Sequence, residues 1–177
     1  QHYTTALSEA ERMHKDAQSR QDDYGMAYSN FCLGVVYANM GNYEESVKAY
    51  EQCLKHRQLD QRLKHGVYYY ACEALSYLKD YDRLMTYTDN YWATLQEDYS
   101  QMADDELAAS PHATPCLIFR AKVLTAKGEL DEAYRMLEKA RPTAMKRKIH
   151  SYHLLYTTAD YYAARHDLKQ ALQVSDE

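Results

Sequence analysis

Apolar residues recur every three or four positions along most of the chain, the spacing that places side chains on one face of an α-helix. This pattern predicts nine helices, at about 3–20, 22–40, 43–57, 61–78, 81–103, 113–127, 130–140, 144–165 and 168–177. The chain holds only 5 Gly and 3 Pro, whereas sheet-rich folds need many tight turns. We therefore expect an all-α protein with short connections, the longest near 104–112, where we also expect the most flexible point.

One stretch, 27–58, holds a register across two helices. Its key positions are Leu33, Gly34, Tyr37, Gly41, Tyr43, Tyr50 and Leu54. Gly34 has no side chain, so a second helix can approach the first there, with Tyr37 and Tyr50 filling the space between them. Gly41 can adopt the left-handed conformation that ends a helix. Asn42 is then expected to cap the next helix, with Glu45 completing an imperfect capping box.

The same register recurs along the chain. A shift of 38 residues brings Gly34 onto Cys72, and a second unit follows. A third unit places Ala121 at the equivalent position, offset by 49 residues because of the longer connection, and a fourth places Ala159 there. Arg120 stands where an apolar residue is expected. The stretch before residue 22 predicts a lone second helix whose partner is missing.

These positions resemble the tetratricopeptide repeat, W-x₂-L-G-x₂-Y…A-x₃-F…P, with Asn30, Ser46 and Gln58 as departures. The resemblance implies an α-solenoid, a right-handed superhelix of antiparallel helix hairpins. We expect one domain over 1–177, with a lone helix at 1–20 and repeats at about 22–58, 61–103, 113–141 and 144–177. The chain opens on Gln1 and stops at Glu177 within a predicted helix, so we expect a fragment of a longer array.

In this family the first helices of successive repeats line a concave face that receives peptides. Carried over by register, the implied groove residues are Tyr28, Phe31, Val35, Asn39, Tyr69, Glu73, Tyr77, Ile118, Lys122, Thr125, His153, Tyr156 and Asp160. Phe31, Tyr69 and Tyr156 occupy equivalent places. They are expected either to pack between hairpins as core or to form the apolar floor of a groove.

Two function classes follow from the resemblance. The first is a protein-binding or peptide-binding scaffold. The second is a sensor or regulatory module of a bacterial signal-transduction protein, in which such repeats precede a histidine kinase or DNA-binding domain. A branch of the family that clamps chaperone carboxylates uses Lys, Arg and Asn. Here the matching places hold Phe31, Val35, Tyr69 and Glu73, so we reject that role.

Composition and residue spacing argue against several kinds of binding and catalytic site. A net charge of −5 argues against direct nucleic-acid binding, because phosphate contacts need a basic face, and the cluster 146–148 is interpreted as a solvated turn. The acidic run 104–106 lacks the spacing of a calcium loop. His150 and His153 lack an evident third metal ligand, and Cys116 lacks an evident base. We expect no enzyme activity and no cofactor.

The sequence says less about membrane contact, cellular compartment and self-association. No apolar stretch is long enough to span a membrane, so we expect no membrane contact within the segment. Unpaired cysteines slightly favour a cytoplasmic location for this segment. If the segment belongs to a membrane-bound sensor, a periplasmic location is the alternative, so the localisation stays open. Helices exposed at the two ends of the array predict self-association.

Overall fold

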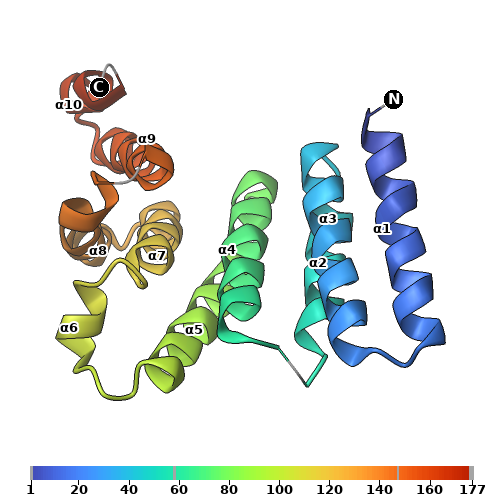
Figure 1. Ribbon diagram of the computed structural model, residues 1–177. Helices are drawn as coiled ribbons and strands as arrows, with labels where there is room; N and C mark the ends of the chain where they lie inside the picture. The colour runs from blue at the N-terminus through green and yellow to red at the C-terminus, as the bar shows by residue number, and fades with distance from the viewer. Residues whose placement is uncertain (1, 58, 147, 176–177) are drawn as a thin grey trace. The chain divides into compact units, whose positions relative to one another are not determined.

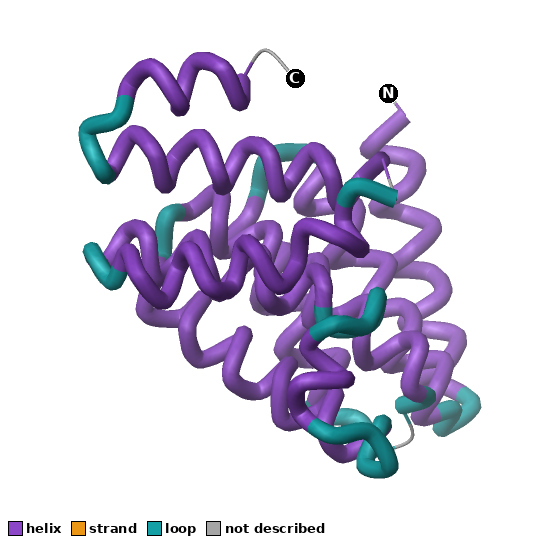
Figure 2. Tube along the Cα trace, turned by 90° about the vertical axis from the view of Figure 1, so that its left-hand side faces the viewer, coloured by secondary structure: helices purple, strands orange, loops and turns teal. Residues whose placement is uncertain are grey.

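The computed structural model describes residues 2–57, 59–146 and 148–175, with the side chains of residues 2, 148 and 149 left out. Throughout these ranges every regular element is an α-helix and no strand is present (Figure 2). The all-α prediction is confirmed. The predicted features at Gln1, Gln58, Arg147 and Glu177 lie outside the described residues.

Contacts divide the chain into two compact units, residues 1–80 and 81–177. The first unit holds four helices, α1 (His2–Ser19), α2 (Asp23–Asn39), α3 (Tyr43–Leu54) and α4 (Gln61–Leu78). Consecutive helices pack on one another, and α2 also contacts α4 (Figure 1). This is the stacking expected of helix hairpins, with α1 in the place of the predicted lone second helix.

The second unit holds α5 (Tyr81–Asp98), α6 (Asp104–Ala108), α7 (Thr114–Lys127), α8 (Leu130–Ala144), α9 (Lys148–Ala164) and α10 (Leu168–Ser175). Here α7 packs on α5, α8 and α9, and α9 packs on α8 and α10. Because it is covered by three neighbours, α7 is buried without a break from Thr114 to Phe119. The single domain and the right-handed superhelix stay predictions, since they depend on how the two units are placed.

The closest approach of two helices in the first repeat occurs at Gly34. A Cβ built there would lie 2.3 Å from Cε1 of Tyr50, whose side chain is fully buried. Ser46, also buried, donates a hydrogen bond of 2.8 Å from its Oγ to the carbonyl oxygen of Gly34. The small residue and the tyrosine ring therefore fix the spacing between α2 and α3.

The helix ends confirm part of the turn prediction. Gly41 and Gly128 both adopt left-handed conformations, with φ of 77° and 81°. Asn42 stands at the N-cap position just before α3, but its side chain makes no capping hydrogen bond, so the predicted capping box is wrong. Side-chain caps occur instead at Asp22, which accepts from the N–H of Gly25, and at Asp60, which accepts from that of Leu63.

Boundaries differ from the predicted ones in two regions. The helix expected over 81–103 ends at Asp98, and the expected loop at 104–112 contains the short helix α6. The first turn of α6 is acidic, which the helix dipole favours. Leu107 of the same helix is buried in the core.

The second difference concerns α8, which continues through Pro142 to Ala144. The buried residues Ala140 and Ala144 extend its apolar stripe past the proline, which explains why the helix does not stop there. The helix expected over 144–165 correspondingly begins later, as α9.

The close approach at Gly34 generates the first prediction. Gly34→Ala should lower the free energy of unfolding by about 1–3 kcal/mol, because the new methyl group overlaps the buried Tyr50 ring. Gly66→Ala is the matched control. Its Cβ would meet Phe31 at an ordinary 3.7 Å, so the gain in helix propensity should stabilise by up to about 1 kcal/mol. Urea denaturation of both variants measures the effects, and equal effects would contradict the packing argument.

Candidate functional site

A groove lies between the two first helices of the N-terminal unit, α2 and α4. Its volume is about 490 Å³. Four predicted groove residues line it together: Val35, Asn39, Glu73 and Tyr77. Tyr43 and Tyr70, which were not in the predicted set, line it as well.

The groove combines an aromatic wall with few charges. The rings of Tyr43 and Tyr77 stack with centroids 4.8 Å apart, and Tyr77 is 58% exposed. Asn39 donates from its amide nitrogen to the carbonyl oxygen of Val35, at 2.8 Å, which holds the amide at the groove. Among the described lining residues, Glu73 is the only charged one. A ligand would therefore meet aromatic surface, an amide and one carboxylate.

An aromatic cluster continues from this groove along the same two helices. Tyr28 contacts Phe31, and Phe31 contacts Tyr70 with ring centroids 5.7 Å apart. Tyr69 meets Tyr70 edge to face, at 5.0 Å. Burial, followed by the charge of Glu73, raises the pKa of Tyr69 above its usual value, so its hydroxyl stays protonated. Tyr28 is exposed, whereas Phe31 and Tyr69 are half-buried.

In the C-terminal unit, predicted residues from α7 and α9 also meet. Lys122 places its ammonium 4.8 Å from the ring centroid of Tyr156, a cation–π contact. His153 lies beside Phe119, with ring centroids 5.7 Å apart. Asp160 is half-buried and, after burial itself, is the main cause that raises the pKa of Tyr81. Tyr156 is 55% exposed and is the part of this cluster most open to solvent.

Two predicted groove positions require correction. Ile118 is only 2% exposed and belongs to the core of α7, and Thr125 is buried as well. Both lie in runs of buried residues on α7, 114–119 and 123–125, so register positions that line a groove on α2 and α4 are covered here. The expectation that Phe31, Tyr69 and Tyr156 share one face concerns both units and stays a prediction.

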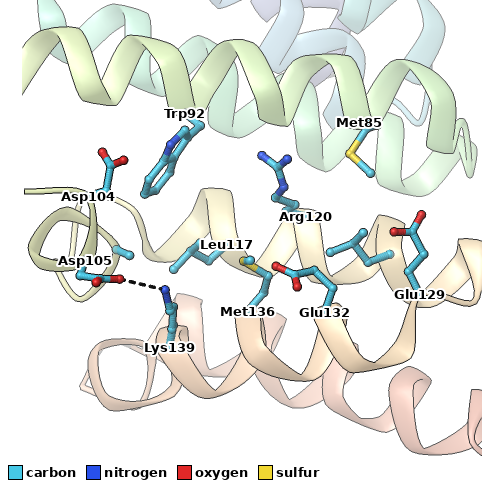
Figure 3. Close-up of a pocket in the computed structure, with 12 residues that line it drawn as sticks. Met85, Trp92, Asp104, Asp105, Leu117, Arg120, Glu129, Glu132, Met136 and Lys139 are labelled. Atoms are coloured by element: carbon cyan, nitrogen blue, oxygen red, sulfur yellow. Dashed lines mark hydrogen bonds and ion pairs between the residues drawn. The ribbon is translucent and has the colours of Figure 1, made fainter.

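A second cleft, lined by α5, α6, α7 and α8, was not predicted. Its volume is about 470 Å³, and it holds Trp92 and Arg120 (Figure 3). Arg120 does not enter the core, because its guanidinium turns to α5 and pairs with Asp89 at 2.9 Å. The charged residue at an apolar position of the repeat was the signal in the sequence that could have located this cleft.

The terminal hairpin presents apolar surface. A groove of about 800 Å³ between α9 and α10 is lined by Tyr152, Tyr156, Leu168 and Leu172, all exposed. At the other end, Tyr3 and Met13 of α1 are exposed too. Self-association through these surfaces stays a prediction.

Side-chain chemistry in the described residues offers little for catalysis. Cys116 is fully buried, its Sγ donates to the carbonyl oxygen of Thr88, and burial raises its pKa to about 12. At neutral pH it is therefore a thiol, which is the unreactive form. Within the described ranges no group of three or more His, Cys, Asp or Glu side chains could hold a metal ion, at His150 and His153 or elsewhere. Nor does any described helix have the length and apolarity needed to cross a bilayer.

Hairpins stacked in a repeating register, with a groove between successive first helices, define a tetratricopeptide repeat (TPR) domain. The family model described as the SusR N-terminal TPR domain matches residues 2–175, and the chain belongs to this family. No curated protein and no solved structure matches the chain. TPR domains are generally scaffolds that bind proteins or peptides and do not catalyse reactions.

The contrast between exposed and buried tyrosines on α9 generates the second prediction. Tyr156→Ala should leave the melting temperature nearly unchanged, because the ring is largely in solvent. Tyr161→Ala, on the same helix but 1% exposed, should cost about 3–5 kcal/mol, as buried aromatic truncations do. Thermal denaturation compares the two. A large loss in Tyr156→Ala would place this residue in the core and remove it from the candidate site.

A third prediction concerns the cysteines. In the native protein Cys32, which is half-buried, should react with iodoacetamide before the others, because Cys53, Cys72 and Cys116 are buried. Burial also raises the pKa of Cys53, to about 12, which keeps its thiolate scarce at neutral pH. Mass spectrometry of timed alkylation gives the order, with urea-unfolded protein as the control. Rapid native labelling of Cys116 would contradict the burial of this thiol.

Proposed function

We propose that this domain binds an extended peptide segment of another protein in the groove between α2 and α4. The observation that carries the proposal is the convergence of Val35, Asn39, Glu73 and Tyr77 on one groove from two successive first helices. Their positions follow from the repeat register, which is how this class of domain builds a ligand surface.

The lining indicates the chemistry of the peptide. The stacked Tyr43 and Tyr77 supply rigid aromatic area at little cost in conformational entropy. The Asn39 amide offers a polar group to a peptide backbone. Glu73 favours a lysine or arginine and disfavours an acidic residue or a terminal carboxylate near it. The preferred segment therefore carries an apolar or aromatic anchor and a basic residue.

The cluster of Lys122, His153, Tyr156 and Asp160 supports a second contact surface in the C-terminal unit. It offers a cation, a carboxylate and an exposed ring within one patch between α7 and α9. This patch lies within the C-terminal unit and is a contact surface in its own right.

The alternative is a sensor or regulatory module in bacterial signal transduction. The family description favours it in one respect, since it refers to an N-terminal domain and so to further chain after the repeats in SusR. The domain composition of the full-length protein tests this alternative. A hydrophobic span followed by a coiled coil and an output domain supports it, and a chain without an output domain contradicts it.

The groove generates the fourth prediction. Peptides selected from a displayed random library should carry an aromatic or aliphatic anchor near a basic residue. Fluorescence polarisation with a selected, labelled peptide should show about tenfold weaker binding by Tyr77→Ala, since a central aromatic is worth more than ~1 kcal/mol at a binding surface.

Tyr3→Ala is the matched control, because Tyr3 is 52% exposed in the same unit but lies outside the groove. It should bind like the unmodified protein, and both variants should keep their melting temperatures. A library that yields no binder, or binders that Tyr77→Ala and Tyr3→Ala weaken equally, would overturn the proposed function.

A further inference from the structure

The cleft lined by α5, α6, α7 and α8 is separate from the groove between α2 and α4, and its charges are unevenly compensated. Its apolar walls come from Met85 and Trp92 on α5 and Met136 on α8, all half-buried, while Leu117 and Leu124 form a buried floor. Its volume of about 470 Å³ lies within the range of sites that hold small molecules or a few side chains.

Both basic residues of the cleft already have acidic partners. Arg120 pairs with Asp89 at 2.9 Å. Lys139 pairs with Asp105 at 3.2 Å, as the dashed line in Figure 3 marks. The positive charges are therefore fixed and neutralised, so the cleft has little attraction for an anion.

Two carboxylates in the cleft lack such compensation. Asp104 accepts a hydrogen bond of 2.8 Å from the neutral amide of Gln96. The Glu129 side chain makes no hydrogen bond or ion pair with the described residues, and nearby Lys127 binds Asp82 at 2.8 Å. A third carboxylate, Glu132, is neutralised by Arg135.

The two uncompensated carboxylates stand at opposite ends of the cleft. Figure 3 shows Asp104 beside Trp92 at one end and Glu129 beyond Met85 at the other. The lining between them consists mainly of sulfur, indole and aliphatic surface. Thioether side chains adapt to varied apolar shapes, and an indole face attracts a cation.

We propose that this cleft binds a basic amphipathic peptide segment of a partner protein, with apolar side chains against Trp92, Met85 and Met136 and lysine or arginine near Asp104 and Glu129. Charge complementarity selects this occupant: an acidic segment would face two carboxylates without a free cation to receive it. The cleft is a second binding surface, and it does not depend on the groove between α2 and α4.

The protein contains one tryptophan, Trp92, so its intrinsic fluorescence reports on the cleft directly. The probes are an amphipathic peptide of lysine and leucine and a peptide of the same pattern with glutamate in place of lysine. The basic peptide should change the Trp92 emission saturably and bind more weakly at high salt. The acidic peptide should leave the emission unchanged.

The double variant Asp104→Asn, Glu129→Gln should bind the basic peptide about five- to tenfold more weakly at low ionic strength, since two exposed charge pairs are removed. The matched control is Glu97→Gln, Asp131→Asn. It removes the same charge from exposed carboxylates of the same unit that do not line the cleft, and it should bind normally. Met136→Lys, which places a cation inside the cleft, should abolish binding.

No emission change with the basic peptide, equal binding of the acidic one, or equal weakening by both double variants would overturn the inference. Tyr77→Ala should leave this titration unaffected. Failure here therefore leaves the proposed peptide groove standing, and failure of that groove leaves this inference standing.

Discussion

The close approach of α2 and α3 at Gly34 is the constraint on which the first repeat depends, and the repeat register carries its position along the chain. The position is held by Gly34, Cys72, Ala121 and Ala159, all small residues. At Gly34 the ring of Tyr50 occupies the space that any side chain would need, with 2.3 Å to an added Cβ. A single hairpin cannot bury all of its apolar side chains between its own two helices. The remaining apolar faces are buried against the next hairpin. The pairing of α2 with α3, and the groove between α2 and α4, follow from that constraint.

The register was predictable because it depends on residues with few substitutes. Only small residues fit the close approach, and glycine tolerates the left-handed conformation seen at Gly41 and Gly128. Four of the predicted residues therefore met in the groove between α2 and α4. The cap at Asn42 was less predictable, because a helix can begin without a side-chain cap. The Asn42 side chain makes no capping hydrogen bond here.

Burial at a single repeat position could not be predicted from register alone. Phe31, Tyr69, Ile118 and Tyr156 are equivalent by the repeat, yet Ile118 is core, Phe31 and Tyr69 are half-buried, and Tyr156 is largely exposed. Ile118 lies within the stretch of α7 that is buried without a break, 114–119, whereas Tyr156 lies on α9, whose last neighbour is the short terminal helix α10. Tyrosine tolerates this range because its ring can be covered while its hydroxyl stays near water. Ile118 is thus core, whereas the choice between core and groove for the three aromatics stays a prediction.

The departure from the 38-residue spacing has a structural consequence that the repeat itself would not produce. The offset of 49 residues between Cys72 and Ala121 accommodates α6, a helix that regular repeats lack. This helix contributes Asp104, Asp105 and Ala108 to the wall of the second cleft. Asp105 neutralises Lys139 there, while Asp104 adds a carboxylate whose partner is a neutral amide. The irregular connection therefore changes the electrostatics of the second cleft, while the regular positions determine the groove between α2 and α4.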